Sequence, residues 1–255
     1  MINTLIAFVK KLRDSLADKL GYYNVTLPYV VIVILALIFV VLGINLFIEL
    51  TDTLTTDQLS YYDDKVTDFV ISHRSSGLTD YFTFVTRVGD VNGYIVVTII
   101  TAIITLVVLK KRKYMMQIGL VMVLSALSNL VLKRAINRAR PTIEHLVTAE
   151  TLSYPSGHAM AAMSFYGFIM YLFYKMKMNK FIKYAGMLIM AILILSIGVS
   201  RIYLGVHFPS DIAGGFIAGA IWVVFCILIF NIIEVFRRDP VTDAIDDRED
   251  IYETD

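Results

Sequence analysis

Three short motifs in this chain of 255 residues contain side chains that together could bind a phosphate group and attack it. The motif at residues 133–141 supplies a lysine and several arginines, and the motif at residues 155–158 ends in a histidine. The motif at residues 200–211 supplies an arginine, a histidine and an aspartate. Each motif taken alone also has an ordinary structural explanation.

The first motif, Lys133-Arg-Ala-Ile-Asn-Arg-Ala-Arg140-Pro141, is a run of cations. Lys133 and Arg140 are two helical turns apart, so both project to one side if the helix continues that far. Pro141 disfavours helical backbone at Arg140 and turns the chain. Two cations on one face suit an oxyanion such as phosphate, which arginine can bind through two parallel hydrogen bonds. A basic cluster that snorkels to a membrane surface has the same composition.

The second motif, Pro155-Ser156-Gly157-His158, opens an apolar run. A Ser-Gly turn at the start of a helix presents free backbone N–H groups at the positive end of the helix dipole, and this arrangement binds anions. Alternatively, Ser156 is only the N-cap of the helix and His158 is a capping or interfacial residue.

The third motif runs from Ser200 to Asp211. Pro209 suits the first turn of a helix, so His207 would lie just before that helix and Asp211 within it. The Asp211 carboxylate could then reach one imidazole nitrogen and raise the basicity of the other, which makes a histidine a nucleophile or a base. Alternatively, Asp211 caps the helix and His207 has no role.

The composition indicates which solvent surrounds these motifs. Hydrophobic residues make up 57% of the chain and charged residues 18%, whereas about a quarter of a soluble domain is charged. The mean hydropathy is +0.70. A formal net charge of +1 argues against a generally basic nucleic-acid-binding protein, and the composition excludes a disordered chain. The single cysteine, Cys226, can form no internal disulfide and completes no zinc-ligand pattern.

Six apolar runs predict six transmembrane helices, because about 20 apolar residues cross a bilayer and about 17 still suffice. The runs are Tyr29–Ile48, Gly93–Leu109, Tyr114–Leu132, Met160–Tyr174, Tyr184–Ser200 and Ile212–Ile233. None of them contains Lys, Arg, Asp or Glu. We therefore expect an all-α polytopic membrane protein with a six-helix domain over residues 28–235.

The basic residues predict the orientation, because short cytoplasmic loops are enriched in Lys and Arg. With the N-terminus inside, the inner segments hold 15 of the 23 basic residues and the outer segments hold eight. This bias predicts that both termini are cytoplasmic. Four of the outer cations form a tight group on the disfavoured side, and these are Lys133, Arg134, Arg138 and Arg140. Topology does not explain this group, so we expect it to have a function.

The remaining segments complete the predicted architecture. Residues 1–27 are expected to form an amphipathic helix on the cytoplasmic face or a frayed terminal helix, and residues 236–255 form an acidic cytoplasmic tail. In the long outer segment, residues 62–73 follow a helical pattern that predicts an interfacial helix, either beside a lateral entry from lipid or as an ordinary connector. Gly215 and Gly219 favour close helix packing, either internally or between two copies of the chain.

In this topology all three motifs fall at the outer ends of the third to sixth spans. Three cations, two histidines, one carboxylate and two helix N-termini can therefore meet at one place. Lys-x6-Arg-Pro, Pro-Ser-Gly-His and Ser-Arg-x5-His-x3-Asp, in that order, resemble the three signature motifs of the type 2 phosphatidic acid phosphatase superfamily. The match shows no departure at the signature positions, and the six-span pattern extends it over most of the chain. Its membrane members include lipid phosphate phosphatases, phosphatidylglycerophosphatase B-like enzymes and undecaprenyl-diphosphate phosphatases.

The resemblance implies a phosphohistidine mechanism at the extracytoplasmic face of the cell membrane. His207 would be the nucleophile, Asp211 would hold its far nitrogen, and His158 would act as general acid and then as base. The residues expected to bind the phosphate are Lys133, Arg140, Ser156, Gly157 and Arg201. The expected substrate is a lipid phosphate that enters from the bilayer, such as phosphatidylglycerophosphate, phosphatidic acid or undecaprenyl diphosphate.

Two other functions are compatible with parts of this pattern. A lipid phosphotransferase would use the same motifs with an alcohol in place of water. A transporter is supported only by the six spans, because no ionisable residue lies within them. We expect no cofactor and no nucleic-acid partner, and the oligomeric state stays open.

The absence of a metal requirement is directly testable. Two histidines and one aspartate could ligate zinc, but the three neighbouring cations would oppose a divalent ion. We therefore expect EDTA to leave phosphatase activity intact, and vanadate to inhibit it. Loss of activity in EDTA that zinc restores would contradict the metal-free mechanism.

Overall fold

The structure is a computed structural model that describes residues 27–108, 112–148, 151–176 and 178–237. It divides into two compact units, Val40–Val224 and a second unit of Met1–Phe39 with Phe225–Asp255. All predicted site residues belong to the first unit. In the second unit, the described residues are the first part of one helix and the last part of another. The predicted amphipathic N-terminus and acidic tail lie outside the described residues, apart from their junctions with these helices.

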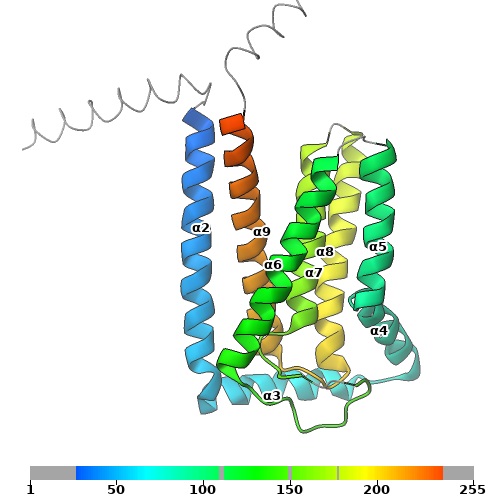
Figure 1. Cartoon of the computed structure of the whole chain (residues 1–255). Coiled ribbons are helices and arrows are strands. Elements are labelled where there is room, and N and C mark those ends of the chain that lie inside the picture. The colour runs from blue at the N-terminus through cyan, green and yellow to red at the C-terminus, as the bar shows by residue number, and fades with distance from the viewer. Residues whose placement is uncertain (1–26, 109–111, 149–150, 177, 238–255) are drawn as a thin grey trace, which may run out of the picture. The chain divides into compact units, whose positions relative to one another are not determined.

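The described chain is helical, with no β-strand in the ranges given above (Figure 1). In chain order its elements are α2 (Leu27–Asp52), the 3-10 helix η1 (Thr53–Thr55), α3 (Asp57–Ser72), α4 (Ser76–Val88), α5 (Val91–Ile103), the π-helix η2 (Ile104–Val108), α6 (Arg112–Ile136), α7 (Gly157–Lys175), α8 (Lys180–Tyr203) and α9 (Pro209–Arg237). Each predicted apolar run falls in a helical segment as far as it is described, and the second run is divided between α5 and η2, with Leu109 outside the described residues.

Four helices in the described part of the chain are long and apolar enough to cross a bilayer, namely α2, α6, α8 and α9. Helices α4 and α5 meet this standard as a pair, but they are bent by 60° relative to each other. The structure therefore offers four spans, or five with the bent pair. The all-helical membrane fold agrees with the sequence, whereas the count of six stays a prediction.

Helix α7 is largely buried, with nine of its 19 residues in the core. It packs against both α6 and α8, and its buried side chains include Ser164 and Tyr166. Helix α9 also approaches α7 closely. A Cβ atom at Gly215 would lie 2.8 Å from Ala159 Cβ, and one at Gly219 would lie 2.7 Å from the Met160 carbonyl oxygen. The small-residue pair therefore serves packing within the chain.

Helix α3 lies crosswise to α6, α7 and α8 at one end of these helices (Figure 1). It contains the helix predicted for residues 62–73 and begins earlier, at Asp57. Its burial is the reverse of a simple amphipathic pattern, because Asp63 and Thr67 are buried while Tyr62 and Phe69 are exposed. A polar face thus points into the protein, and it does so because Asp63 has a charged partner there.

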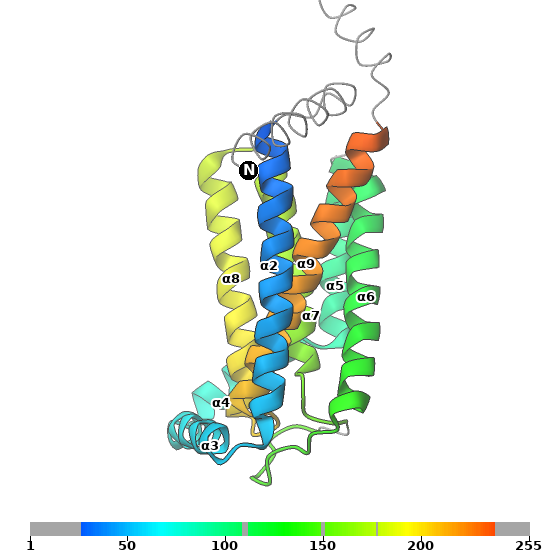
Figure 2. The ribbon, with the colours of Figure 1, turned by 90° about the vertical axis from the view of Figure 1, so that its left-hand side faces the viewer.

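Helix α6 ends, α7 begins and α8 ends at the end of the unit where α3 lies (Figure 2). The last helical residue of α6 is Ile136, and Asn137 follows with a φ of 54°. Asparagine tolerates this left-handed conformation, which commonly terminates helices. The helix therefore does not continue as far as Arg140, so a shared helical face is not what places Lys133 and Arg140 on one side. Arg140 lies in the loop that leads to α7.

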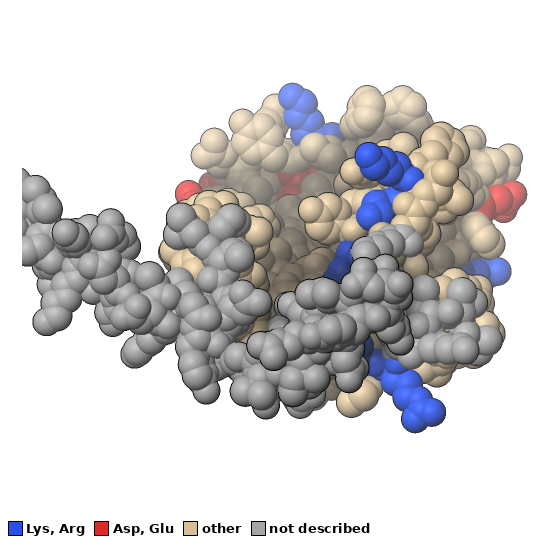
Figure 3. All heavy atoms as spheres, turned by 90° about the horizontal axis from the view of Figure 1, so that it is seen from above, with Lys and Arg blue, Asp and Glu red and all other residues tan. Residues whose placement is uncertain are grey.

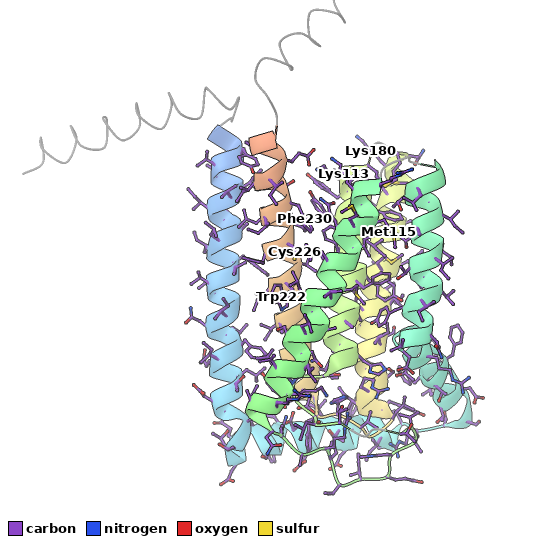
Figure 4. The ribbon with its side chains drawn as sticks, in the orientation of Figure 1. Lys113, Met115, Lys180, Trp222, Cys226 and Phe230 are labelled. Carbon is purple, nitrogen blue, oxygen red and sulfur yellow. The ribbon has the colours of Figure 1, made fainter. Side chains whose placement is uncertain are left out.

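The opposite end of these helices is basic. Its described cations are Arg112, Lys113, Lys175, Lys180 and Lys183. Lys113 and Lys180 lie at the first turns of α6 and α8 (Figure 4). Seen from this end, the described surface shows Lys and Arg side chains and few Asp or Glu side chains (Figure 3). Cations thus lie at both ends of these helices, and the orientation with this end in the cytoplasm stays a prediction.

Gly205 connects α8 to the segment that carries His207. Its φ is 81°, and a Cβ atom there would lie 2.5 Å from the Glu144 carbonyl oxygen. We expect Gly205→Ala to lower the free energy of unfolding by at least about 1 kcal/mol, because it combines an unfavourable backbone conformation with a clash. Thermal unfolding in detergent can be followed with a thiol-reactive dye, because the single cysteine, Cys226, is buried.

Gly77→Ala provides the matched control. A Cβ atom at Gly77 would meet nothing within 4 Å, and alanine is the better helix former. This variant should unfold at the wild-type temperature or slightly above it. Identical unfolding of the Gly205 and Gly77 variants would show that the left-handed backbone at Gly205 is not required.

Candidate active site

Asp211 lies in the first turn of α9 and is completely buried. Its Oδ2 atom accepts hydrogen bonds from Ser153 Oγ at 2.5 Å and from the Phe208 backbone N–H at 2.8 Å. The same oxygen lies 3.4 Å from His207 Nδ1. The position of Pro209 at the start of α9 agrees with the sequence prediction, and it places the carboxylate within reach of the imidazole.

His207 is held in one orientation by these neighbours. Its Nδ1 lies 3.2 Å from Ser153 Oγ. Because Ser153 donates its own proton to Asp211, its oxygen can accept one from Nδ1. This arrangement leaves Nε2 as the unprotonated nitrogen. Burial lowers the pKa of His207 from 6.5 to about 3 although Asp211 opposes the shift, so the imidazole is neutral at physiological pH.

A buried ion pair that the sequence did not suggest supports Asp211 from the other side. Arg138 Nη1 donates to Asp211 Oδ1 at 2.7 Å, and Arg138 Nη2 donates to Asp63 Oδ2 at 2.8 Å. Asp63 also accepts from the Ser210 backbone N–H and hydroxyl at 2.9 and 2.5 Å. The Arg138 guanidinium lies 4.5 Å from the centroid of the Phe208 ring. Helix α3, the loop after α6 and the start of α9 are thereby joined.

Lys133 and Arg140 come together through Thr151 rather than through a shared helix. Lys133 Nζ and Arg140 Nη2 each donate to Thr151 Oγ1 at 3.3 Å, and Arg140 Nε donates to the Thr151 carbonyl at 2.6 Å. Lys133 also donates to the Leu152 carbonyl. Arg140 Nη1 lies 3.2 Å from His207 Nε2. A cation thus adjoins the nitrogen that is free to attack.

Arg201 is a third cation near this nitrogen, and only 4% of it is exposed. Its Nη1 donates to Thr86 Oγ1 at 2.5 Å, whereas its buried Nε has no hydrogen-bond partner in the described structure. Within the described ranges, none of Lys133, Arg140 and Arg201 forms an ion pair with a carboxylate. Burial lowers the pKa of Arg140 from its usual value. An anion would therefore relieve both desolvation and mutual repulsion of these cations.

His158 has a carboxylate partner of its own. Its Nε2 lies 2.8 Å from Asp90 Oδ1, and Asp90 occupies the bend between α4 and α5. About half of the Asp90 side chain is exposed, against 21% for His158. The second histidine is therefore oriented independently of the Asp211 network.

The sequence left open whether Ser156 and Gly157 cap a helix or bind an anion, and the structure gives the two residues different positions. Ser156 is the N-cap of α7, and its Oγ accepts from the Ala159 backbone N–H at 3.5 Å. Its own backbone N–H donates to the Asp211 carbonyl at 3.0 Å. The Ser156 side chain is fully buried, so its hydroxyl serves the cap, whereas Gly157 reaches the open side of the turn.

A cavity of about 550 Å³ lies beside the start of α7 at Gly157. Six of the eight predicted site residues line it, namely Lys133, Arg140, Gly157, His158, Arg201 and His207. Ser156 and Asp211 lie behind its wall. Leu127 and Leu130 of α6 form part of the remaining lining. The cavity thus combines cations, two imidazoles and aliphatic side chains of a membrane-spanning helix.

Five further residues hold this site together and were not predicted from the sequence, namely Asp63, Asp90, Ser153, Thr151 and Arg138. Arg138 belonged to the basic cluster that had no topological explanation, so its charge was noticed but not its partner. The other four are single polar residues, of which Asp63 lies within α3 and the rest lie between helices. No periodicity or spacing marks such residues, because their partners are distant in the chain.

Comparisons with known proteins relate the chain to one superfamily. Residues 114–233 match the PAP2 superfamily. The chain is 29% identical over 177 residues to phosphatidylglycerophosphatase B of Bacillus subtilis (strain 168). The aligned segment covers 68% of this chain and 85% of that protein.

Two solved structures share the fold. The crystal structure of a transmembrane PAP2 type phosphatidylglycerolphosphate phosphatase from Bacillus subtilis matches with a TM-score of 0.71 and 28% identity, covering 78% of this chain and 98% of that chain. Aquifex aeolicus LpxE matches with a TM-score of 0.52 and 23% identity, covering 64% of this chain and 93% of that chain. The second likeness concerns the fold alone.

Proposed function

Residues 114–233 form a PAP2 superfamily domain, and from this premise we propose that the chain hydrolyses a phosphomonoester or diphosphate carried by a membrane lipid. The likeness to this superfamily and to the Bacillus subtilis relatives supports a membrane phosphatase. The observation that carries the proposal is the single cavity lined by six of the predicted residues and by leucines of α6. The name of the Bacillus subtilis relative favours phosphatidylglycerophosphate, and phosphatidic acid and undecaprenyl diphosphate are the other candidates.

The proposed reaction begins with attack by His207 Nε2 on phosphorus. A bond forms between this nitrogen and the phosphorus, and the bond from phosphorus to the lipid oxygen breaks. His158 donates a proton to the departing oxygen, so the lipid leaves as a neutral alcohol or as the next phosphate. Water then attacks the phosphohistidine with His158 as base, which releases inorganic phosphate and restores His207.

The cations supply the electrostatic part of this mechanism. Arg140 Nη1 is already 3.2 Å from the attacking nitrogen, and Arg201 has an unused buried Nε donor. Together with Lys133 and the start of α7 at Gly157, they would neutralise the equatorial oxygens of the phosphoryl group.

The leucines on the cavity wall support a lipid substrate. Leu127 and Leu130 are 57% and 46% exposed. They belong to a helix apolar enough to span a membrane, so their exposed side chains can contact lipid. An acyl or prenyl chain could lie along these leucines while its phosphate reaches His207. We propose that this occurs at the extracytoplasmic end of a six-span domain with both termini inside, because the cations at the other end of α6 and α8 suit the cytoplasmic side.

The nucleophile assignment is tested by His207→Ala. This variant should release phosphate from phosphatidic acid in mixed micelles at least about a thousand-fold more slowly than wild type, because no covalent intermediate can form. His73→Ala alters an exposed histidine of another segment and should retain activity. Full turnover by the His207 variant would contradict the mechanism, and transfer of phosphate to added alcohol instead of water would identify a phosphotransferase.

The role of Asp90 is tested by Asp90→Asn, which removes the charge beside His158 and keeps the shape. Without the carboxylate the imidazolium is less stable, so His158 would lose its proton at lower pH. Because His158 must be protonated to donate, the alkaline limb of kcat/KM against pH should move to lower pH by roughly 0.5–1 unit.

Asp80→Asn is the matched control, since Asp80 is an exposed carboxylate on α4. Its profile should coincide with that of wild type. If the Asp90 and Asp80 variants gave the same profile, Asp90 would have no influence on the proton donor.

A further inference from the structure

A second cavity of about 440 Å³ adjoins the one that contains His207. The two cavities share Leu130, Lys133, Arg140 and Thr151 as lining residues. The second cavity has walls of its own in Arg134, Ala139 and Leu152. Lys133 and Arg140 therefore stand between two spaces, of which the proposed mechanism uses only one.

The second cavity is positively charged. Arg134 is exposed, and it forms no hydrogen bond or ion pair with any residue that the structure describes. Lys133 and Arg140 are drawn together by their common acceptor, the Thr151 hydroxyl. No carboxylate lines either cavity in the described part of the chain. Three like charges line this cavity without an acidic partner, and an anion bound between them would lower their mutual repulsion.

The position of Arg134 on α6 connects this charge to the lipid side of the site. Leu127, Leu130 and Arg134 follow each other at intervals of three and four residues, so they share one face of the helix. The leucines line the first cavity and Arg134 lines the second. A substrate that lies along this face would place its headgroup near both cavities.

We propose that the second cavity is a subsite for a second phosphate group of the substrate, with Arg134 as the residue that recognises it. This inference rests on the proposed function. While the terminal phosphoryl group faces His207, the neighbouring phosphate of a lipid diphosphate, or of a lipid with a phosphodiester beside its phosphomonoester, occupies the second cavity. Lys133 and Arg140 contact both groups from the shared wall. A lipid monophosphate leaves the subsite empty.

The test compares two substrates that differ by one phosphate, diacylglycerol diphosphate and phosphatidic acid with the same acyl chains. Initial-rate kcat/KM values in the same detergent micelles give a selectivity ratio for each variant. In Arg134→Gln the ratio of diphosphate to monophosphate should fall about ten-fold, because one charge-assisted hydrogen bond is lost for the diphosphate alone.

Two further variants separate recognition from a structural role. Arg87→Gln removes an exposed arginine of α4 that lines neither cavity, and its ratio should equal that of wild type. Ala139→Phe fills the second cavity without changing charge, since Ala139 lines only that cavity, and its ratio should also fall.

The outcomes distinguish this subsite from the function on which it rests. If wild type hydrolyses neither lipid, the proposed function fails. Suppose instead that wild type hydrolyses both lipids. If the Arg134 variant then loses the same share of activity on both lipids, or loses none on either, the subsite is wrong while the function stands. An equal loss would assign Arg134 to the stability of the α6 C-terminus, where a cation favours the helix dipole.

Discussion

The buried charge of Asp211 is the constraint on which the site depends. A carboxylate with no exposed surface is stable only if it is paired and hydrogen-bonded, and Arg138, Ser153 and the Phe208 backbone provide this. The same guanidinium also pairs with Asp63, which accepts from its second Nη group. The polar face of α3 is therefore turned inward, and a helix far away in the sequence becomes part of the support for His207.

The cations around His207 fall into two classes that composition cannot separate. Arg138 is neutralised by two carboxylates and holds the protein together. Lys133, Arg140 and Arg201 have hydroxyl and carbonyl partners but no carboxylate among the described residues. Their charge is uncompensated, which is costly in the free protein and useful for an anion. A basic cluster at a membrane surface can thus contain both a structural and a binding component.

The sequence predicted the helical elements well where a local pattern determines them. The start of α9 at Pro209 and the N-cap at Ser156 follow from single residues with strong positional preferences. The helical course of residues 62–73 followed from apolar spacing, but its buried face did not, because Asp63 is buried by a partner 75 residues away. The sequence left open how far α6 continues beyond Leu132, because the left-handed conformation that follows its end at Asn137 is one that asparagine permits but does not require.

The sequence by itself determined that the protein lies in a membrane, that it is helical, and which residue types gather at one end of its helices. It also contained the three motifs that carry the resemblance to the phosphatase superfamily. Only the tertiary structure decided which of those residues share a cavity, which lie behind its wall, and which polar residues orient the two histidines. The physical reason is that hydrophobic periodicity and helix capping act between neighbours in the chain, whereas the pairing of buried charges acts between residues that only the fold brings together.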